Sequence, residues 1–473
     1  MIDNNWAEKE IENIMIGDDR LVKRLVHIIK NLADSPESSM PHAFKNSKDI
    51  KALYRFLDNK NAKREAILEA HINKTIERVN KSDIVLLVQD TTSFSYNDRE
   101  SIDGMGIAGK FNNNKGLLMH STLAVSVDGT PLGVLSQDIW TRNPEERGMK
   151  SDRKGRNNSH KFKTEEKESR KWIDAFYQCE ENMPKDIRTV TICDREADIY
   201  KFFYEVVEHK QDFVVRVGGQ KRRVAGEMNL LNDEIESKDV MGYISVDIPR
   251  NINDGYPSRI ATLSIKYSPI TLLPPLRKTE FKGMPEIKVN VILAEEINTP
   301  VGLTPIKWFL LTTMPVSSVE EAFEKIHWYK HRWLIERYHY ILKSGCRIEE
   351  LQLDNVERIK KSIAIYAIVA WRLEWLVYES RNNPTSSCKK AFSDDEWQVL
   401  YCVANETTDI PSESPSLSEA VLMVAKLGGF MARRSDRNPG VKVIWRGLRK
   451  LSNLCMGWNA AKMVNHPIHM GKE

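Results

Sequence analysis

Two short apolar runs, each followed directly by an aspartate, constrain the fold of this chain more than any other feature. The run IVLLVQ is expected to end at Asp90 and a Thr-rich turn, and the run RTVTIC leads to Asp194. Continuous apolar runs of this length are typical of strands in a sheet that helices cover. A carboxylate in such a place is costly to bury unless it is paired or binds a cation. The pattern therefore predicts two acidic groups at the rim of a sheet, where functional groups gather, although either one alone is more typical of a cap on the next turn or helix.

The patterns around these runs indicate a mixed α/β layer. The segment STLAVSVDGTPLGVLSQDIW is typical of a hairpin whose turn lies at Asp128–Gly129. A charged helix over 164–182 leads to the second run, and a helix over 199–210 and the strand FVVRV come after it. We therefore expect the order β-β-β-α-β-α, in which strands pack beneath covering helices.

The hydrophobic periodicity of the remaining residues divides them into helical and strand-like segments. Amphipathic helical patterns such as LVKRLVHIIKNLA occupy the first 80 residues, and strand-like runs separated by Pro, Gly and Asn follow the α/β layer. Long helices are expected over 319–343 and 359–379. We expect five segments: a helical domain at 1–80, the first part of an α/β core at 81–217, a β-rich insertion at 218–315, the second part of the core at 316–380 and a helical region at 381–473.

Local charge is more informative than the total, because the net charge of the 473-residue chain is only +4. From Arg20 to Arg64 there are eleven lysines and arginines against four acids. A second basic cluster lies within 150–163. Patches of this kind suit a phosphate backbone, and a solvated helix face or loop is the equally favoured alternative for each patch alone.

Cysteine usage and hydropathy favour a cytoplasmic protein without a membrane partner. The six cysteines are scattered, with no C-x-x-C pair, which indicates reduced thiols. The polar start MIDNNWAEKE lacks the apolar core of a signal peptide. The longest apolar stretch, 363–371, is far shorter than the roughly 20 residues that span a bilayer.

A third acidic residue lies on a predicted helix with one mixed face. At about 100° per residue, Tyr329, Arg332, Glu336 and Lys343 fall within an arc of roughly 60°. The carboxylate can complete a metal site with the two aspartates, while the cations hold phosphates. The alternative is an exposed ion-paired face, because Arg332 and Glu336 are four residues apart.

Other motifs point less strongly to a site. His327 and His331 are spaced like a zinc pair, but no H-E-x-x-H motif or partner cysteine accompanies them, so packing or exposure is expected. Glu196 and Asp198 follow Asp194 and are expected to open a helix, where the helix dipole favours acids. The sequence contains no glycine motif of the kind that binds nucleotide phosphates.

Several segments together carry a family resemblance. They are QDTTSFSY, CDREADIY, AEEINTP and PIKWFLLTTMPV, together with the spacing Y-x₂-R-x₃-E-x₆-K. These segments resemble DDE transposases of the insertion-sequence type-four family, of which that last spacing is the signature. The similarity covers most of the chain, from about residue 15 to the LGGF segment at 427–430 and beyond.

The resemblance implies an RNase H-like catalytic core interrupted by the β-rich insertion, with a helical end-recognition domain before it and a helical dimerisation region after it. Asp90, Asp194 and Glu336 match the family's catalytic, metal-binding triad, which takes two Mg²⁺ ions, or Mn²⁺ in their place. Other matched positions contact DNA in the family. They are the backbone-binding Tyr329, Arg332 and Lys343, the DNA-contacting Arg216, Trp308 as the receiver of a flipped base, and Trp333 as a weaker stacking candidate.

The resemblance also implies a reaction and partners. Similar proteins bind transposon ends as a homodimer in a synaptic complex at the bacterial nucleoid. They nick the ends, close and reopen a hairpin, and join the 3′-hydroxyl to target DNA. Two other classes stay open. One is a non-catalytic DNA-binding dimer or repressor derived from a transposase, and the other is a different RNase H-like nuclease, such as a junction resolvase or an RNA–DNA hybrid nuclease.

Overall fold

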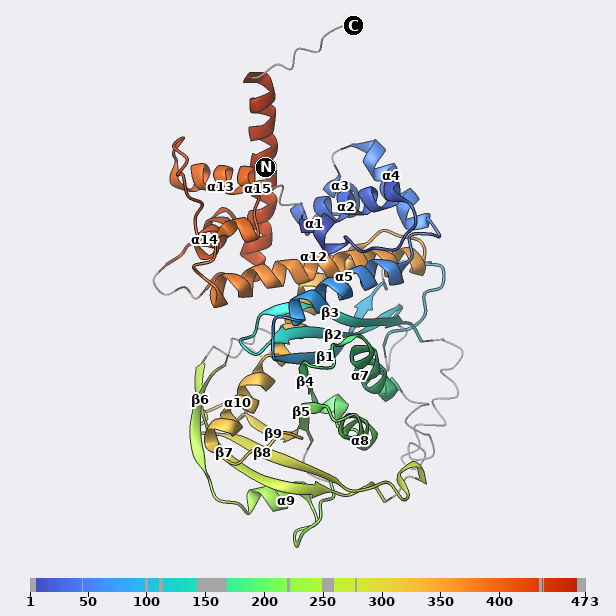
Figure 1. The fold of residues 1–473 in the computed structure, drawn as a ribbon, viewed down its shortest axis with the longest axis vertical. Coiled ribbons are helices and arrows are strands. Elements are labelled where there is room, and N and C mark those ends of the chain that lie inside the picture. The colour runs from blue at the N-terminus through green and yellow to red at the C-terminus, as the bar shows by residue number, and fades with distance from the viewer. Residues whose placement is uncertain are drawn as a thin grey trace.

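The computed structural model describes residues 6–44, 46–97, 101–109, 114–142, 168–218, 222–248, 259–276, 279–433, 436 and 438–465. The fold is mixed α/β and is built on one large sheet that helices cover (Figure 1). The basic cluster at 150–163 and the first residues of the helix predicted at 164–182 lie outside the described residues.

The first five strands form the half of the sheet that carries both aspartates. Antiparallel pairing joins β3 to β2 and β2 to β1, and parallel pairing joins β1 to β4 and β4 to β5. Helices α7 (Lys171–Asn182) and α8 (Tyr200–Glu208) follow β3 and β4, so the predicted order β-β-β-α-β-α is confirmed. The strands are β1 (Ile84–Ser95), β2 (Gly116–Ser126), β3 (Pro131–Trp140), β4 (Arg188–Cys193) and β5 (Asp212–Val217).

The β-rich stretch extends this sheet instead of forming a separate one. β9 pairs antiparallel with β5, where Val214 lies opposite Thr312, and β8, β7 and β6 follow in that order. The strands predicted within 218–315 are present, and a short helix, α9 (Leu231–Glu236), accompanies them. The strands are β6 (Gly242–Ile248), β7 (Arg259–Leu272), β8 (Ile287–Ile297) and β9 (Lys307–Thr312).

Helices come before the sheet in the chain, as the first 80 residues predict. In α2 the apolar face is confirmed, because Leu25, Ile28 and Ile29 are fully buried and Leu21 is half-buried. The last of these helices, α5, packs on β3 and so belongs to the layer that covers the sheet. The helices are α1 (Trp6–Glu10), α2 (Asp19–Asp34), α3 (Met40–Ala43), α4 (Ser47–Asp58) and α5 (Arg64–Val79).

The helix predicted at 319–343 is broken, which corrects the expectation of one continuous amphipathic helix. α10 (Val319–Lys330) ends at His331, α11 (Arg332–Tyr340) follows, and a π-helical turn (Ile341–Gly345) completes the segment. The break lies where His331 Nε2 approaches the carbonyl of Val127, at 3.2 Å, in the β2–β3 turn. Tertiary contact therefore overrides the local helical preference at this point. The His331 imidazole also packs edge to face on the ring of His327, with centroids 4.8 Å apart.

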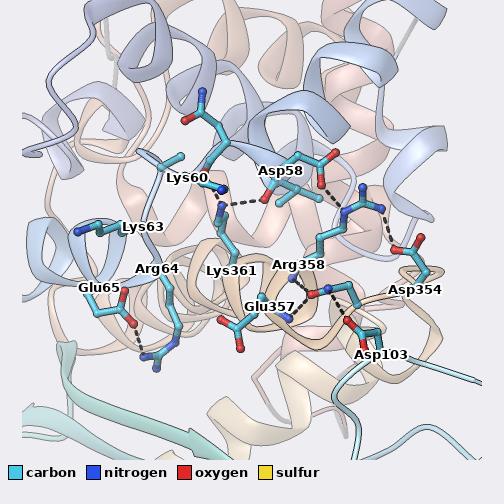
Figure 2. A pocket seen from close by; sticks show the side chains of 14 residues that line it. Asp58, Lys60, Lys63, Arg64, Glu65, Asp103, Asp354, Glu357, Arg358 and Lys361 are labelled. Atoms are coloured by element: carbon cyan, nitrogen blue, oxygen red, sulfur yellow. Dashed lines mark hydrogen bonds and ion pairs between the residues drawn. The ribbon is translucent and has the colours of Figure 1, made fainter.

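The helix predicted at 359–379 is α12 (Val356–Asn382), which lies beside α5 on the sheet, with the other N-terminal helices on its far side (Figure 1). Its first turns hold the end of α4, since Lys361 Nζ donates to the carbonyls of Leu57 and Asn59 at 2.7 and 2.9 Å (Figure 2). Although α12 is mostly buried, neither it nor another helix within the described ranges is apolar over enough residues to span a bilayer.

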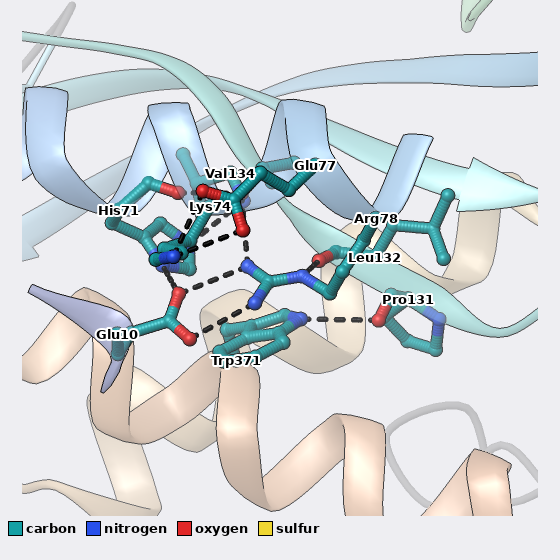
Figure 3. A network of polar contacts seen from close by, with 10 residues as sticks. Glu10, His71, Lys74, Glu77, Arg78, Pro131, Leu132, Val134 and Trp371 are labelled. Atoms are coloured by element: carbon teal, nitrogen blue, oxygen red, sulfur yellow. Dashed lines mark hydrogen bonds and ion pairs between the residues drawn. The ribbon is translucent and has the colours of Figure 1, made fainter. Parts of the chain in front are cut away.

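A buried polar network ties α1 to the sheet and to α12 (Figure 3). Glu10 accepts a hydrogen bond from His71 Nδ1 at 2.6 Å and two from Arg78 at 2.9 Å. His71 Nε2 accepts from the amide of Val134 at 3.0 Å, which fixes the imidazole proton on Nδ1. The Arg78 guanidinium lies 4.1 Å from the ring centroid of Trp371 in α12. The start of the described chain is thereby anchored to the body of the molecule.

The C-terminal helices α13 (Asp394–Asn405), α14 (Leu417–Leu427) and α15 (Val441–Asn465) pack together, and α15 extends away from the sheet (Figure 1). The helical content predicted after residue 381 is therefore present. α15 also meets the end of α2, where Ser452 Oγ donates to Asp34 Oδ2 at 3.3 Å.

Candidate active site

Asp90 and Asp194 follow the paired parts of two neighbouring parallel strands. β1 and β4 pair with a constant offset up to Val88 opposite Ile192. Asp90 lies two residues after Val88, and Asp194 lies two residues after Ile192, directly beyond the end of β4. Adjacent strands are about 4.8 Å apart. The two aspartates predicted from the apolar runs therefore meet at one place.

The strand does not end at Asp90, which corrects the turn expected there. Parallel pairing with β4 stops at Val88, but antiparallel pairing with β2 continues through Asp90 opposite Ser121 to Ser95 opposite Gly116. The Thr-rich segment after Asp90 is extended because β2 offers it a full set of backbone partners. Asp90 consequently lies within a strand, at the point where the neighbour on one side has ended.

The Asp90 carboxylate is largely buried, with 19% of its side chain exposed. Burial raises the pKa of Asp90 to about 7, and the negative charges of Asp194 and Glu336 act in the same direction. The Thr91 amide and the charge of Arg332 act in the opposite direction. The three acids of the predicted triad thus lie within electrostatic reach of one another. Like charges gathered in this way favour a bound cation.

Glu336 comes to this place on α11, which packs against β1. Its carboxylate accepts a hydrogen bond from Arg332 Nη1 at 2.5 Å, so the expected pair at four-residue spacing is confirmed. The Arg332 side chain is 11% exposed, whereas that of Glu336 is 50% exposed. Although burial opposes the charge, the neighbouring Tyr329 and Glu336 raise the pKa of Arg332. A permanent cation therefore lies beside the acids.

The three carboxylates are ligands of the kind that a hard divalent cation prefers, but they are not gathered around a single point. Within the described ranges, no three histidine, cysteine, aspartate or glutamate side chains are arranged to hold a metal ion. Asp194 Oδ1 accepts the amide of Glu196 at 2.8 Å, and Glu336 Oε1 is paired with Arg332. Each acid keeps a second oxygen, and oxygen ligands are those that Mg²⁺ prefers.

Tyr329, Arg332, Arg216 and Trp308 form one cluster beside α11. The Tyr329 and Trp308 rings meet edge to face with centroids 5.5 Å apart, and the Arg332 guanidinium lies 5.9 Å from the Tyr329 ring. Arg216 donates to the carbonyl of Lys307 at 3.4 Å. Burial raises the pKa of Tyr329, whereas both arginines lower it. Four of the residues predicted to contact DNA are thus neighbours.

The remaining predicted residues lie around this cluster in different settings. Trp308 is 7% exposed and packs within β9, so a role in receiving a base stays a prediction. Trp333 is half-buried in α11. Lys343 lies in the π-helical turn, with Nζ 5.9 Å from the ring of Phe94 in β1. The break at His331 and the π turn interrupt the helix, so the predicted side chains do not share one ideal helical face. They are neighbours through the contacts described above.

Two acids that the sequence assigned to a helix start have specific partners. Asp198 Oδ2 accepts the amide of Gly218 at 3.1 Å, and its carboxylate forms an ion pair with Arg222. Glu196 pairs with Lys171 of α7 at 3.2 Å. Glu196 lies within a 3₁₀ turn (Arg195–Ala197) capped by Asp194, Asp198 directly follows that turn, and α8 begins only afterwards. The D-R-E-A-D motif therefore anchors the loop after β4 to the segment after β5 and to α7.

One neighbour of Asp90 was missed in the sequence. His339 Nδ1 lies 3.7 Å from Asp90 Oδ2, and burial lowers the pKa of this histidine to about 3. His339 follows Glu336 by three residues, a spacing that places both side chains on one side of a helix. This spacing is the feature of the sequence from which His339 could have been predicted to lie near the acids.

Three protein-family models match successive parts of the chain. The model described as "Transposase DNA-binding" matches residues 3–62, "Transposase DDE domain" matches 121–372, and "Transposase Tn5 dimerisation domain" matches 368–466. The DDE model covers more than half of the chain and includes Asp194 and Glu336, whereas Asp90 precedes it.

A solved structure is also similar to this chain. It is the cryo-EM structure of a piggyBac transposase synaptic complex with hairpin DNA, at 8% sequence identity and a TM-score of 0.34. The match covers 91% of this chain and 64% of that chain, so the present chain spans less than two thirds of the length of that transposase.

Proposed function

Because this chain belongs to the DDE transposases, we propose that it moves DNA by cut-and-paste transposition. It binds transposon ends, cleaves them by metal-dependent phosphoryl transfer through a hairpin intermediate, and joins the 3′-hydroxyl ends to target DNA. Its substrate is chromosomal DNA, so we propose that it acts at the bacterial nucleoid.

The observation that carries the proposal is the convergence of three acids from distant parts of the chain. Asp90 and Asp194 each come two residues after the last pair of the adjacent parallel strands β1 and β4, and both Asp194 and Glu336 lie within electrostatic reach of Asp90. The strand order β3-β2-β1-β4-β5 supports the RNase H-like core that the family resemblance implies. We propose that these three acids are the catalytic triad.

We propose that the triad holds two Mg²⁺ ions, or Mn²⁺ in their place, through its carboxylate oxygens. When bound, two such ions activate the attacking oxygen and stabilise the leaving oxygen of an in-line displacement at phosphorus. One site can then serve nicking, hairpin formation, hairpin opening and strand transfer, because each step is the same displacement with a different nucleophile.

The cluster beside the triad would hold the DNA strand. If Glu336 turns towards the aspartates, the Arg332 guanidinium is freed, and its planar fork matches two phosphate oxygens. Tyr329 and Lys343 supply a hydroxyl and a second cation for the backbone on either side, and Arg216 adds a third. Trp308 would leave its packed position to stack on a flipped base, which offsets part of the cost of unstacking that base.

The outer parts of the chain would supply partners and synapsis. The segment matched as a transposase DNA-binding region carries the basic stretch from Arg20 to Arg64, which suits a phosphate backbone. The segment matched as a dimerisation region includes α13, α14 and α15. We propose domains at 1–80 for end recognition, 81–217 and 316–380 for the catalytic core, 218–315 for the insertion and 381–473 for a homodimer that pairs two DNA ends.

The test begins with selection of bound DNA fragments from the source genome, followed by cleavage mapping in Mg²⁺. Asp90→Ala, Asp194→Ala and Glu336→Ala should each abolish nicking and leave end binding largely intact. Asp212→Ala is the matched control, because Asp212 is also a partly buried strand aspartate, hydrogen-bonded to Arg188 at 2.7 Å, at the amino end of β5.

Retained cleavage by any one of the three variants would remove that residue from the triad. A wild-type chain that binds ends but nicks them in neither Mg²⁺ nor Mn²⁺ would contradict the enzyme proposal and favour a DNA-binding repressor. Cleavage without any strand-transfer product would favour a different nuclease. Loss of cleavage in the Asp212 variant would indicate that the assay reports on folding.

A further inference from the structure

His339 is the protein group that approaches the Asp90 carboxylate from α11. Its Nδ1 lies 3.7 Å from Asp90 Oδ2, just beyond the length of a hydrogen bond. The His339 side chain is only 6% exposed, so solvent does not compete for this contact. The pair joins the strand that carries one acid of the triad to the helix that carries another.

Both flanks of Asp90 carry polar atoms whose hydrogen-bonding capacity is unused. His339 Nε2 and the hydroxyl of Ser121 are buried, and neither has a hydrogen-bond partner among the described residues. Ser121 lies directly opposite Asp90 on β2, so its side chain is on the same face of the sheet. Buried polar groups without protein partners are uncommon in folded proteins. The surroundings of Asp90 are therefore polar but incompletely bonded.

The chain places His339 so that a small movement completes the contact. His339 and Glu336 are three residues apart on α11 and hence neighbours on its surface. A shift of α11 that brings Glu336 towards the aspartates would carry the imidazole towards Asp90 in the same motion. The Nδ1–H group would then donate to Oδ2 and leave Oδ1 of Asp90 free for a cation.

We propose that His339 is a positioning residue that hydrogen-bonds Asp90 Oδ2 and fixes the orientation in which this carboxylate binds divalent cations. The inference rests on the proposed function, because it assumes that Asp90 binds metal. Groups that hydrogen-bond metal-ligating carboxylates orient them, and their loss typically weakens metal binding by about 10- to 100-fold. An uncharged donor suits this place, because a cation here would offset the negative charge that attracts the metal.

The test measures binding of Mn²⁺ alone to the full chain, from the electron paramagnetic resonance signal of free Mn²⁺. His339→Leu, which keeps a similar volume and has no donor, should raise the Mn²⁺ dissociation constant roughly tenfold. His339→Asn places an amide nitrogen near the position of Nδ1 and should restore binding to within about threefold of wild type. His339→Gln places its amide near Nε2 and should restore less.

The control is His120→Asn. His120 is equally buried, but it pairs with Thr91, whose side chain faces the other side of β1. The His120→Asn variant should therefore bind Mn²⁺ as tightly as wild type. Wild-type affinity in the Leu variant, or rescue by Gln as good as rescue by Asn, would overturn the proposal. If the Leu variant does not fold, as judged by its thermal melting, the order of the Asn and Gln variants decides alone. Asp90→Ala separates the role of His339 from the metal site. If this variant binds Mn²⁺ as tightly as wild type, the proposed metal site itself is contradicted.

Discussion

Two buried carboxylate–imidazole pairs in this molecule are built in opposite ways. Glu10 and His71 are 2.6 Å apart and lie in a network that also includes Arg78, whereas Asp90 and His339 are 3.7 Å apart and lie beside two other acids. Although burial works to raise it, the hydrogen bonds and charges of His71 and Arg78 lower the pKa of Glu10 to about 2. Burial and like charges instead raise the pKa of Asp90 to about 7.

The contrast separates a group that stabilises the fold from a group that we propose takes part in catalysis. Every charged atom of Glu10 meets a donor, so the pair fixes α1 to the body of the molecule. Asp90 is held near acids with too few donors, which destabilises the folded state unless a cation binds. Strained electrostatics of this kind are typical of active sites, where stability is lost in favour of function.

The largest effect is expected from Asp90→Asn. The change removes the charge of a proposed metal ligand, so DNA cleavage in Mg²⁺ should fall at least ~1,000-fold, which corresponds to about 4 kcal/mol of activation free energy. The free energy of unfolding without metal should stay the same or rise by about 1 kcal/mol, because repulsion among the acids is relieved. Quantitative cleavage assays and urea unfolding without metal would check the two parts. A variant that is clearly less stable than wild type would break the contrast.

Glu10→Gln should show the reverse pattern. Removal of the charge leaves Arg78 poorly paired in a largely buried place, so the free energy of unfolding should fall by about 3 kcal/mol. The folded fraction should still cleave DNA at the wild-type rate. Glu12→Gln is the matched control, because Glu12 pairs with Lys74 at 3.0 Å but is 63% exposed, and such pairs contribute roughly 0.5 kcal/mol. Equal losses in the two variants would mean that the network has no special weight.

The stabilisation by Glu10 should depend on pH in one direction. Its folded pKa of about 2 is below the ordinary value of 4.5, so its contribution is fully present above pH 4.5 and is lost as the pH falls towards 2. The difference in melting temperature between wild type and Glu10→Gln should therefore be constant from pH 8 to pH 5 and narrow between pH 4.5 and pH 3. A difference that widens in acid would contradict the assignment of the carboxylate as the charged partner.

The sequence was sufficient where local pattern decides the structure. The apolar runs before Asp90 and Asp194 form the predicted strands β1 and β4, and the four-residue spacing matches the pair of Arg332 with Glu336. Each of these features depends on neighbours close in the chain or on burial of a continuous apolar run.

The sequence was insufficient where distant partners decide. The segment after Asp90 is rich in Thr and Ser, but β2 holds it in the sheet to Ser95, so the expected turn does not form. The helix break at His331 follows from a contact with Val127, some 200 positions away in the chain. Likewise, β9 joins β5 across roughly 100 residues, and the Glu10 network joins residues 61 apart. No local pattern reports such pairings.

The smallest expected effect concerns Trp371, at the border of the Glu10 network. Trp371 Nε1 donates to the carbonyl of Pro131 at 3.0 Å, and its ring stacks under Arg78. Trp371→Phe keeps an aromatic face for the guanidinium but removes the N–H donor, so the free energy of unfolding should fall by only about 1 kcal/mol. Trp375→Phe is the control, because Arg372 lies 5.8 Å from that ring and the contact is looser.

If the Trp371–Pro131 hydrogen bond is independent of the Glu10 network, the double variant Glu10→Gln with Trp371→Phe should lose about the sum of the two single effects on the free energy of unfolding. A double variant that loses much less would show that Trp371 acts through the Glu10 pair, which would widen the stabilising network to include α12.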